Sequence, residues 1–107
     1  METAEAVESL SALAHETRLE VFRLLVQAGP DGLAAGAVGD VLDIPAPTLS
    51  FHLKELRQAG LVGSERVGRS QIYRADYPAM SDLLTYLTDE CCAGLPDDAP
   101  RPREVSA

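Results

Sequence analysis

The chain has few of the residues that stabilise small secreted domains or form membrane segments. Its 107 residues include two cysteines, no tryptophan, three tyrosines and two phenylalanines. Two cysteines cannot form the framework of several disulfides typical of small extracellular domains, and because they are adjacent they could pair only through a strained bridge. No apolar run approaches the ~20 residues of a membrane-spanning helix, and the acidic start of the chain lacks the pattern of a signal peptide. We therefore expect a cytoplasmic protein with reduced thiols and no membrane partner.

Basic residues are also scarce, and their distribution is uneven. The chain has 9 Lys and Arg against 17 Asp and Glu, a net charge of −8, which taken alone argues against a nucleic-acid-binding protein. The basic residues are nevertheless concentrated in one segment. Residues 48–74 carry a net positive charge, whereas residues 1–47 and 75–107 are both acidic. A local basic segment is a more relevant sign of nucleic-acid binding than the total charge.

The spacing of apolar residues predicts five helices, at residues 3–13, 18–28, 34–42, 47–59 and 76–92. Two short runs around Val67-Gly68-Arg69-Ser70 predict a β-hairpin within residues 61–75. Residues 96–107 are rich in proline and charge, which predicts a flexible tail. We expect one domain over residues 1–95, mainly α-helical with a small β-hairpin.

The order of the central elements favours DNA binding. A short helix, a tight turn and a second helix at residues 34–59 form a helix-turn-helix, whose second helix enters the major groove of DNA. The basic hairpin at 61–75 would then be the wing of a winged helix-turn-helix. A small helical domain with a surface hairpin is the alternative.

The second helix of this unit supplies candidate DNA contacts. Leu49, Leu53 and Leu56 form its inward stripe, so several polar residues are expected on or beside the exposed face. Hydroxyl groups in the first turn and a lysine suit phosphate, a histidine suits phosphate or a base edge, and a phenylalanine suits a thymine methyl group. These candidates are Thr48, Ser50, Phe51, His52 and Lys54. Alternatively, Phe51 packs against the wing and His52 is a half-buried, hydrogen-bonded histidine.

Two arginines bracket the turn of the predicted hairpin. Arg66 and Arg69 can reach the minor groove or its flanking phosphates, and ordinary solvated charge is the alternative. Arg74 is further from the tip, and Arg57 has acids within reach, so both are weaker candidates.

Three stretches carry a family resemblance. LSALAHETRLEVFRLL (residues 10–25), PTLSFHLKELRQAGLV (47–62) and RVGRSQIYRA (66–75) resemble the ArsR/SmtB family, over about residues 10–87. The resemblance implies a bacterial homodimeric repressor. Such a repressor binds an operator palindrome in double-stranded DNA and leaves it when a metal or metalloid binds. The apolar stripes of the helices at 3–13 and 76–92 are the expected dimer interface.

The chain departs from two ligand sites of that family. The Cys-x-Cys pair of many arsenic sensors aligns with Ala34 and Gly36, and residues 77–93 contain no histidine for the zinc site on the last helix. The remaining pair, Cys91-Cys92, resembles the vicinal cysteines of members that sense trivalent arsenicals. Some of those members have a third cysteine, which this chain lacks.

We expect Cys91 and Cys92 to bind trivalent arsenic or methylarsenite as an inducer, with no cofactor required, because thiolates select soft ions. Cys91 follows Leu87 by four residues, which would place it on the stripe facing a partner subunit. The alternatives are a thiol-based redox sensor on the same fold and a pair of thiols without a role. His15 precedes a helix, where a helix-end or interface role is favoured over a metal role.

Two other classes of function are weaker candidates for this chain. The sequence has no nucleophile–base pair, metal triad or phosphate-binding loop, so we do not expect an enzyme. A winged helix used for protein–protein contact is the remaining alternative, and the net charge of −8 favours it.

Overall fold

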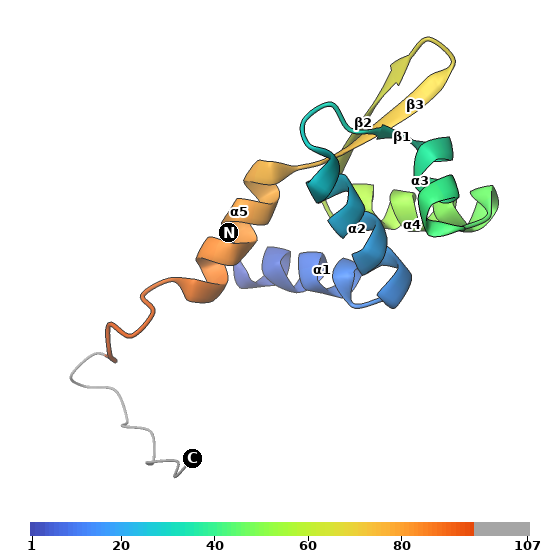
Figure 1. Ribbon diagram of the computed structural model, residues 1–107. Helices are drawn as coiled ribbons and strands as arrows, with labels where there is room; N and C mark the ends of the chain where they lie inside the picture. The colour runs from blue at the N-terminus through green and yellow to red at the C-terminus, as the bar shows by residue number, and fades with distance from the viewer. Residues whose placement is uncertain (96–107) are drawn as a thin grey trace.

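The computed structural model describes residues 1–95, which form five helices and a three-stranded antiparallel sheet (Figure 1). The elements in chain order are α1 Thr3–Leu13, α2 Glu16–Ala28, β1 Leu33–Ala34, α3 Ala35–Leu42, α4 Ala46–Gln58, β2 Val62–Val67, β3 Ser70–Ala75 and α5 Tyr77–Thr88. The predicted class, mainly α with a β-hairpin wing, is confirmed. The predicted tail at 96–107 lies outside the described residues. None of the helices in the described part is long and apolar enough to cross a membrane.

Local hydrogen bonds explain where the helices begin. α2 starts at Glu16, earlier than the predicted start at residue 18, because the Nδ1 atom of His15 accepts a hydrogen bond from the backbone N–H of Thr17 at 3.2 Å. The helix-end role expected for His15 is therefore confirmed. At α5, the side chain of Asp76 accepts from the backbone N–H of Ala79 at 3.0 Å.

The core lies where α2, α3, α4 and the base of β2 meet. Leu53 and Leu56 of α4 and Leu25 of α2 are 1% exposed or less, and Leu49 is 3% exposed. The predicted inward stripe of α4 is therefore confirmed. Gly60 follows the helix with φ +78°, and Leu61 then donates from its backbone N–H to the carbonyl of Leu56 at 3.0 Å. This turn leads directly from α4 into the hairpin.

The sheet contains one strand that the sequence did not predict. β2 and β3 form the expected hairpin, with Val62 opposite Ala75 and Val67 opposite Ser70. β1 adds a short third strand on the other side of β3, where Leu33 lies opposite Tyr73. β1 leads directly into α3, so the helix-turn-helix is joined to the wing by backbone pairing.

α5 is shorter than predicted. It ends at Thr88, so the prediction of a helix as far as residue 92 was wrong. Asp89 is extended, Glu90 has φ +54°, and the last turn contains no basic residue. Two acidic side chains at the negative end of a helix oppose its dipole, which favours termination at this position. The two cysteines consequently lie beyond the helix.

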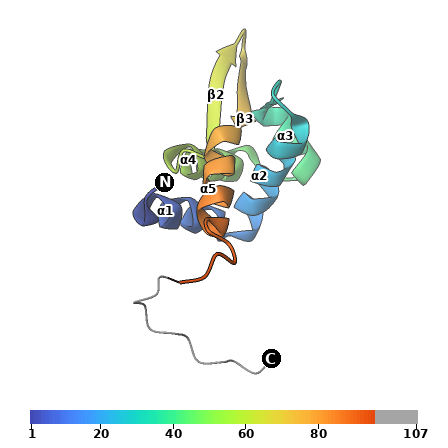
Figure 2. The ribbon, with the colours of Figure 1, turned by 90° about the vertical axis from the view of Figure 1, so that its left-hand side faces the viewer.

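α1 and α5 lie together at the end of the molecule away from the wing tip (Figures 1 and 2). The hydroxyl oxygens of Thr3 and Tyr86 are 2.5 Å apart and link the two helices. Both helices also present large apolar side chains to solvent. These are Val7, Leu10, Leu84 and Leu87, each at least 41% exposed.

Candidate nucleic-acid interface

The exposed face of α4 carries most of the polar residues expected there. Thr48 and Ser50 lie in or next to the first turn, and Phe51 and Lys54 follow along the helix. All four are exposed, with Phe51 at 56%. Exposed hydroxyl groups near the N-terminus of a helix suit phosphate, and an exposed aromatic ring suits an apolar contact. Their contact with DNA stays a prediction.

His52 occupies a different position from the one expected. Its side chain is 6% exposed, so the expectation that it flanks the exposed face was wrong. Its ring contacts that of His15 with centroids 4.7 Å apart, and its Nδ1 atom is buried without a hydrogen-bond partner. The physical reason is spacing: His52 follows Leu49 by three residues and precedes Leu56 by four, so it shares their face.

The surroundings of His52 favour its neutral form. Burial lowers the pKa of His52 below its ordinary value, and the positive charges of His15 and Arg18 lower it further, while Glu55 acts in the opposite direction. Arg18 of α2 and Glu55 of α4 form an ion pair at 3.8 Å. His52 is therefore part of the α2–α4 packing, and its contact with DNA stays a prediction.

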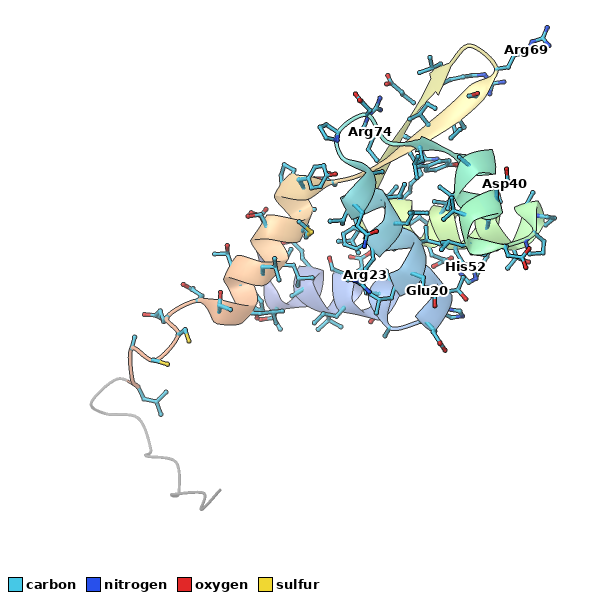
Figure 3. The ribbon with its side chains drawn as sticks, viewed as in Figure 1. Glu20, Arg23, Asp40, His52, Arg69 and Arg74 are labelled. Carbon is cyan, nitrogen blue, oxygen red and sulfur yellow. The ribbon has the colours of Figure 1, made fainter. Side chains whose placement is uncertain are left out.

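The hairpin carries two exposed arginines. Arg66 lies near the end of β2, and Arg69 lies in the turn and points away from the body at the tip of the wing (Figure 3). Neither has an acidic partner within 4.0 Å among residues 1–95. Their charges are free to meet an anion, which is the property that the predicted groove contact requires.

The two weaker candidates, Arg57 and Arg74, differ in whether an acidic side chain binds them. Arg57 is exposed, and within the described part of the chain it forms no ion pair. It lines one surface depression with Lys54 and Gln58, so it extends the basic face of α4. Arg74 is bound instead to Glu65. The i+3 spacing from Lys54 was the sequence signal that could have ranked Arg57 higher.

The two cysteines lie in a turn after α5. Their Sγ atoms are 3.5 Å apart, both side chains are exposed, and both thiols are free. Cys92 has φ +62°, a left-handed conformation that is uncommon for residues other than glycine. Over residues 1–95, no group of three or more His, Cys, Asp or Glu side chains could hold a metal ion. The cysteine pair can therefore supply two sulfur ligands at one place.

Comparison with known proteins agrees with this architecture. A family model described as a helix-turn-helix domain matches residues 13–65. The chain is 30% identical over 98 residues to YbzH of Bacillus subtilis, an uncharacterized HTH-type transcriptional regulator. The aligned region covers 80% of this chain and 98% of YbzH.

Solved structures give the same result. An ArsR-like transcriptional regulator from Rhodococcus sp. RHA1 is 31% identical with a TM-score of 0.69, over 78% of this chain and 76% of that one. The homodimeric winged helix-turn-helix DNA-binding domain of Mb0332 from Mycobacterium bovis is 26% identical with a TM-score of 0.66, over 83% of this chain and 82% of that one. These relatives are regulators and not enzymes. The chain belongs to the ArsR/SmtB family of winged helix-turn-helix transcriptional regulators.

Proposed function

We propose that this protein is a homodimeric repressor that binds an operator palindrome and is released when a trivalent arsenical binds Cys91 and Cys92. DNA contact would come from α4 and the wing. Thr48, Ser50 and Lys54 would hold phosphates, Phe51 would contact a base, and Arg66 and Arg69 would reach the adjacent minor groove. The charges of residues 48–74 support this DNA-contacting surface. Apart from Arg74, the lysine and arginines of this segment have no acidic partner within residues 1–95, so they are free to meet phosphate.

The homodimer is supported by the exposed apolar faces of α1 and α5. Leu84 and Leu87 are 56% and 55% exposed, although they continue the helix that buries Leu83. A groove of about 450 Å³ between α2 and α5, lined mainly by apolar side chains, continues this face. The similar domain of Mb0332 is homodimeric. A second copy would cover these side chains and place two wings for two half-sites, ~34–36 Å apart along the DNA.

The arsenical is supported by one observation, the 3.5 Å separation of two free, exposed thiol sulfurs. At this separation one small thiophilic ion can contact both sulfurs after little movement. Methylarsenite has two exchangeable hydroxyl groups. Each thiol loses its proton, forms one S–As bond and displaces one hydroxyl group, which leaves as water with that proton. Inorganic arsenite has a third position, which water, a small thiol or a partner subunit would fill.

The test uses the full chain and a fluorescent duplex selected from random-sequence DNA by the wild-type protein. Methylarsenite is expected to release the duplex at least as well as arsenite, and zinc is expected to have little effect. The variant Cys91→Ser/Cys92→Ser should bind the duplex like wild type and should not respond. Release of this variant at wild-type arsenical concentrations would remove the cysteines from the mechanism.

A redox sensor is the second candidate, and the same sulfur separation favours it. Two thiols that lose two protons and two electrons to an oxidant would form one S–S bond of about 2.05 Å, which requires the sulfurs to approach from 3.5 Å. Hydrogen peroxide added to the same DNA complex separates the candidates. Release by peroxide and by no arsenical would establish the redox function instead.

A further inference from the structure

The wing projects beyond the helices and is attached to them at its base (Figures 1 and 2). The attachment includes the loop that follows α2 and leads into β1. Arg74 of β3 lies at this place, on the side of the hairpin nearest the loop (Figure 3). A projecting hairpin can reach DNA only at the angle that its base allows, so the contacts of the base govern where the tip lies.

Arg74 connects three parts of the chain. Its Nε atom donates to the carbonyl oxygen of Pro30 at 2.8 Å, in the loop after α2. Its Nη2 atom donates to Oε1 of Glu65, in the neighbouring strand β2, at 2.5 Å. The guanidinium group is planar and rigid, so two bonds from one group fix the loop and β2 relative to β3.

Gly32 brings the loop backbone directly onto the same strand. A Cβ atom at this position would lie 2.7 Å from Cγ of Arg74 and 3.1 Å from Cγ2 of Ile72, and it would also meet the carbonyl oxygen of Tyr73. Gly29, in the same loop, has open space around its Cβ position. Of these two glycines, only Gly32 approaches β3 closely, and it faces Arg74 and the two residues before it.

The loop continues into β1 and then into α3, so its position also governs the helix-turn-helix. Leu33 and Ala34 pair with β3 immediately after Gly32. We propose that Arg74 and Gly32 are positioning residues for DNA binding, which hold the wing at the angle where its tip meets DNA while α4 occupies the groove. This inference rests on the proposed DNA-contacting surface, and in particular on the contact made by the wing.

Arg74 and Arg69 have different roles in this proposal. The Nε and Nη2 donors of Arg74 are occupied by Pro30 and Glu65, and its charge is neutralised by the carboxylate. Arg69 is exposed at the tip without an acidic partner in the described part of the chain. A phosphate contact contributes to the salt dependence of DNA binding, whereas a neutralised positioning residue does not.

The first experiment compares Arg74→Gln/Glu65→Gln with Arg69→Gln. The double variant removes the Arg74 contacts without changing the net charge. Its affinity for the selected duplex should fall about 2- to 30-fold, and its slope of log Kd against log salt should match wild type. Arg69→Gln should also weaken binding, and its slope should fall by about 1. All variants are measured at a temperature where circular dichroism shows them folded.

Each arm can fail separately. Wild-type affinity of the double variant would overturn the proposal, and a slope reduced by about 1 would make Arg74 a phosphate ligand, which also overturns it. Wild-type affinity and slope of Arg69→Gln would instead show that the wing does not contact DNA, so that the proposed surface itself fails.

The second experiment leaves every charge in place. Gly32→Ala and Gly29→Ala both put a Cβ on a residue with positive φ, +69° and +85°, so both carry backbone strain. Gly29 also has ψ −172°, a conformation nearly confined to glycine, so strain alone would not favour a larger effect at Gly32. Only Gly32→Ala collides with β3. Its DNA affinity should fall several-fold further than that of Gly29→Ala, with the wild-type salt slope. Equal effects of the two substitutions would overturn the role of the close approach.

Discussion

The two ends of the molecule differ in how completely their apolar side chains are buried within a single chain. The end that contains α3, α4 and the base of the wing surrounds Val38, Leu53, Leu56 and Leu61, each 1% exposed or less. The end formed by α1 and α5 buries Leu83 but leaves Leu84 and Leu87 more than half exposed. The first end has a complete core in one chain, whereas the second has apolar surface to share with a partner. Substitutions should therefore change folding at one end and association at the other.

Truncation of the core should have the largest effect on folding. Leu53→Ala removes three carbon atoms from a side chain that is 1% exposed. The free energy of unfolding should fall by about 2–5 kcal/mol, because the lost burial is accompanied by a cavity. Urea denaturation of the variant and wild type at two protein concentrations measures this effect. A loss below about 1 kcal/mol would contradict the complete core that we assign to this end.

Charges on the exposed face of α5 should change association. In Leu84→Asp/Leu87→Asp, the dimer dissociation constant should rise on the order of 100-fold or more, because two apolar contacts are replaced by buried like charges. Sedimentation at micromolar concentration checks this, with circular dichroism to show that the helices remain. Val67→Asp is the matched control, since Val67 is 53% exposed on the wing. A wild-type protein that is monomeric in this measurement would contradict the shared apolar surface.

The sequence predicted helices at both ends of the molecule: α1 has the predicted bounds, 3–13, and α4 differs from its prediction by one residue at each end. α4 was found nearly to the residue because its leucine stripe, Pro47 and Gly60 all agree. β1 could not be predicted, since a strand of two residues has no periodicity and forms only because Tyr73 and Ile72 lie opposite. At α5, the apolar spacing continues from Leu87 to Cys91 and predicts a longer helix, but the helix ends at Thr88, before two acidic residues.

The candidate DNA site shows the same limit. Exposure of Thr48, Ser50 and Lys54 followed from the helical stripe, because the stripe defines which face is buried. His52 is buried, although it is expected beside the exposed face, because it lies three residues after Leu49 and four before Leu56. The binding of Arg74 to Pro30 joins residues 44 positions apart, so no local pattern contains it.

Acid should weaken the α2–α4 contact through His52. Its pKa is lowered in the folded state, so the unfolded chain binds the proton more readily. Full stability is therefore present above the unfolded pKa of ~6.5 and is lost as the pH falls from that value through the lowered folded pKa. The charged groups that act on the ring are His15 and Arg18 from α2 and Glu55 from α4.

Urea denaturation at pH 7.5 and pH 5.5 measures this loss. We expect wild type to lose more stability than His52→Gln over this interval. His15→Asn keeps an acceptor for the N–H of Thr17 but removes one positive charge next to His52, so its loss should be intermediate. Equal losses in wild type and His52→Gln would contradict the neutral, buried histidine.

The smallest effect on folding is expected at the cysteines. Within residues 1–95, the side chains of the two cysteines form a hydrogen bond only with each other. Both side chains are exposed and lie beyond the last turn of α5. Cys91→Ser/Cys92→Ser should therefore change the free energy of unfolding by no more than about 0.5 kcal/mol. Leu83→Ala is the reference for the same end, because Leu83 is 5% exposed and its truncation should cost about 2–5 kcal/mol. Urea denaturation of wild type, the double cysteine variant and Leu83→Ala under reducing conditions measures these differences. A loss above about 1 kcal/mol in the cysteine variant would mean that the thiols pack against the body or a second subunit. They would then have a structural role at this end, and the response to arsenicals would have to be separated from it.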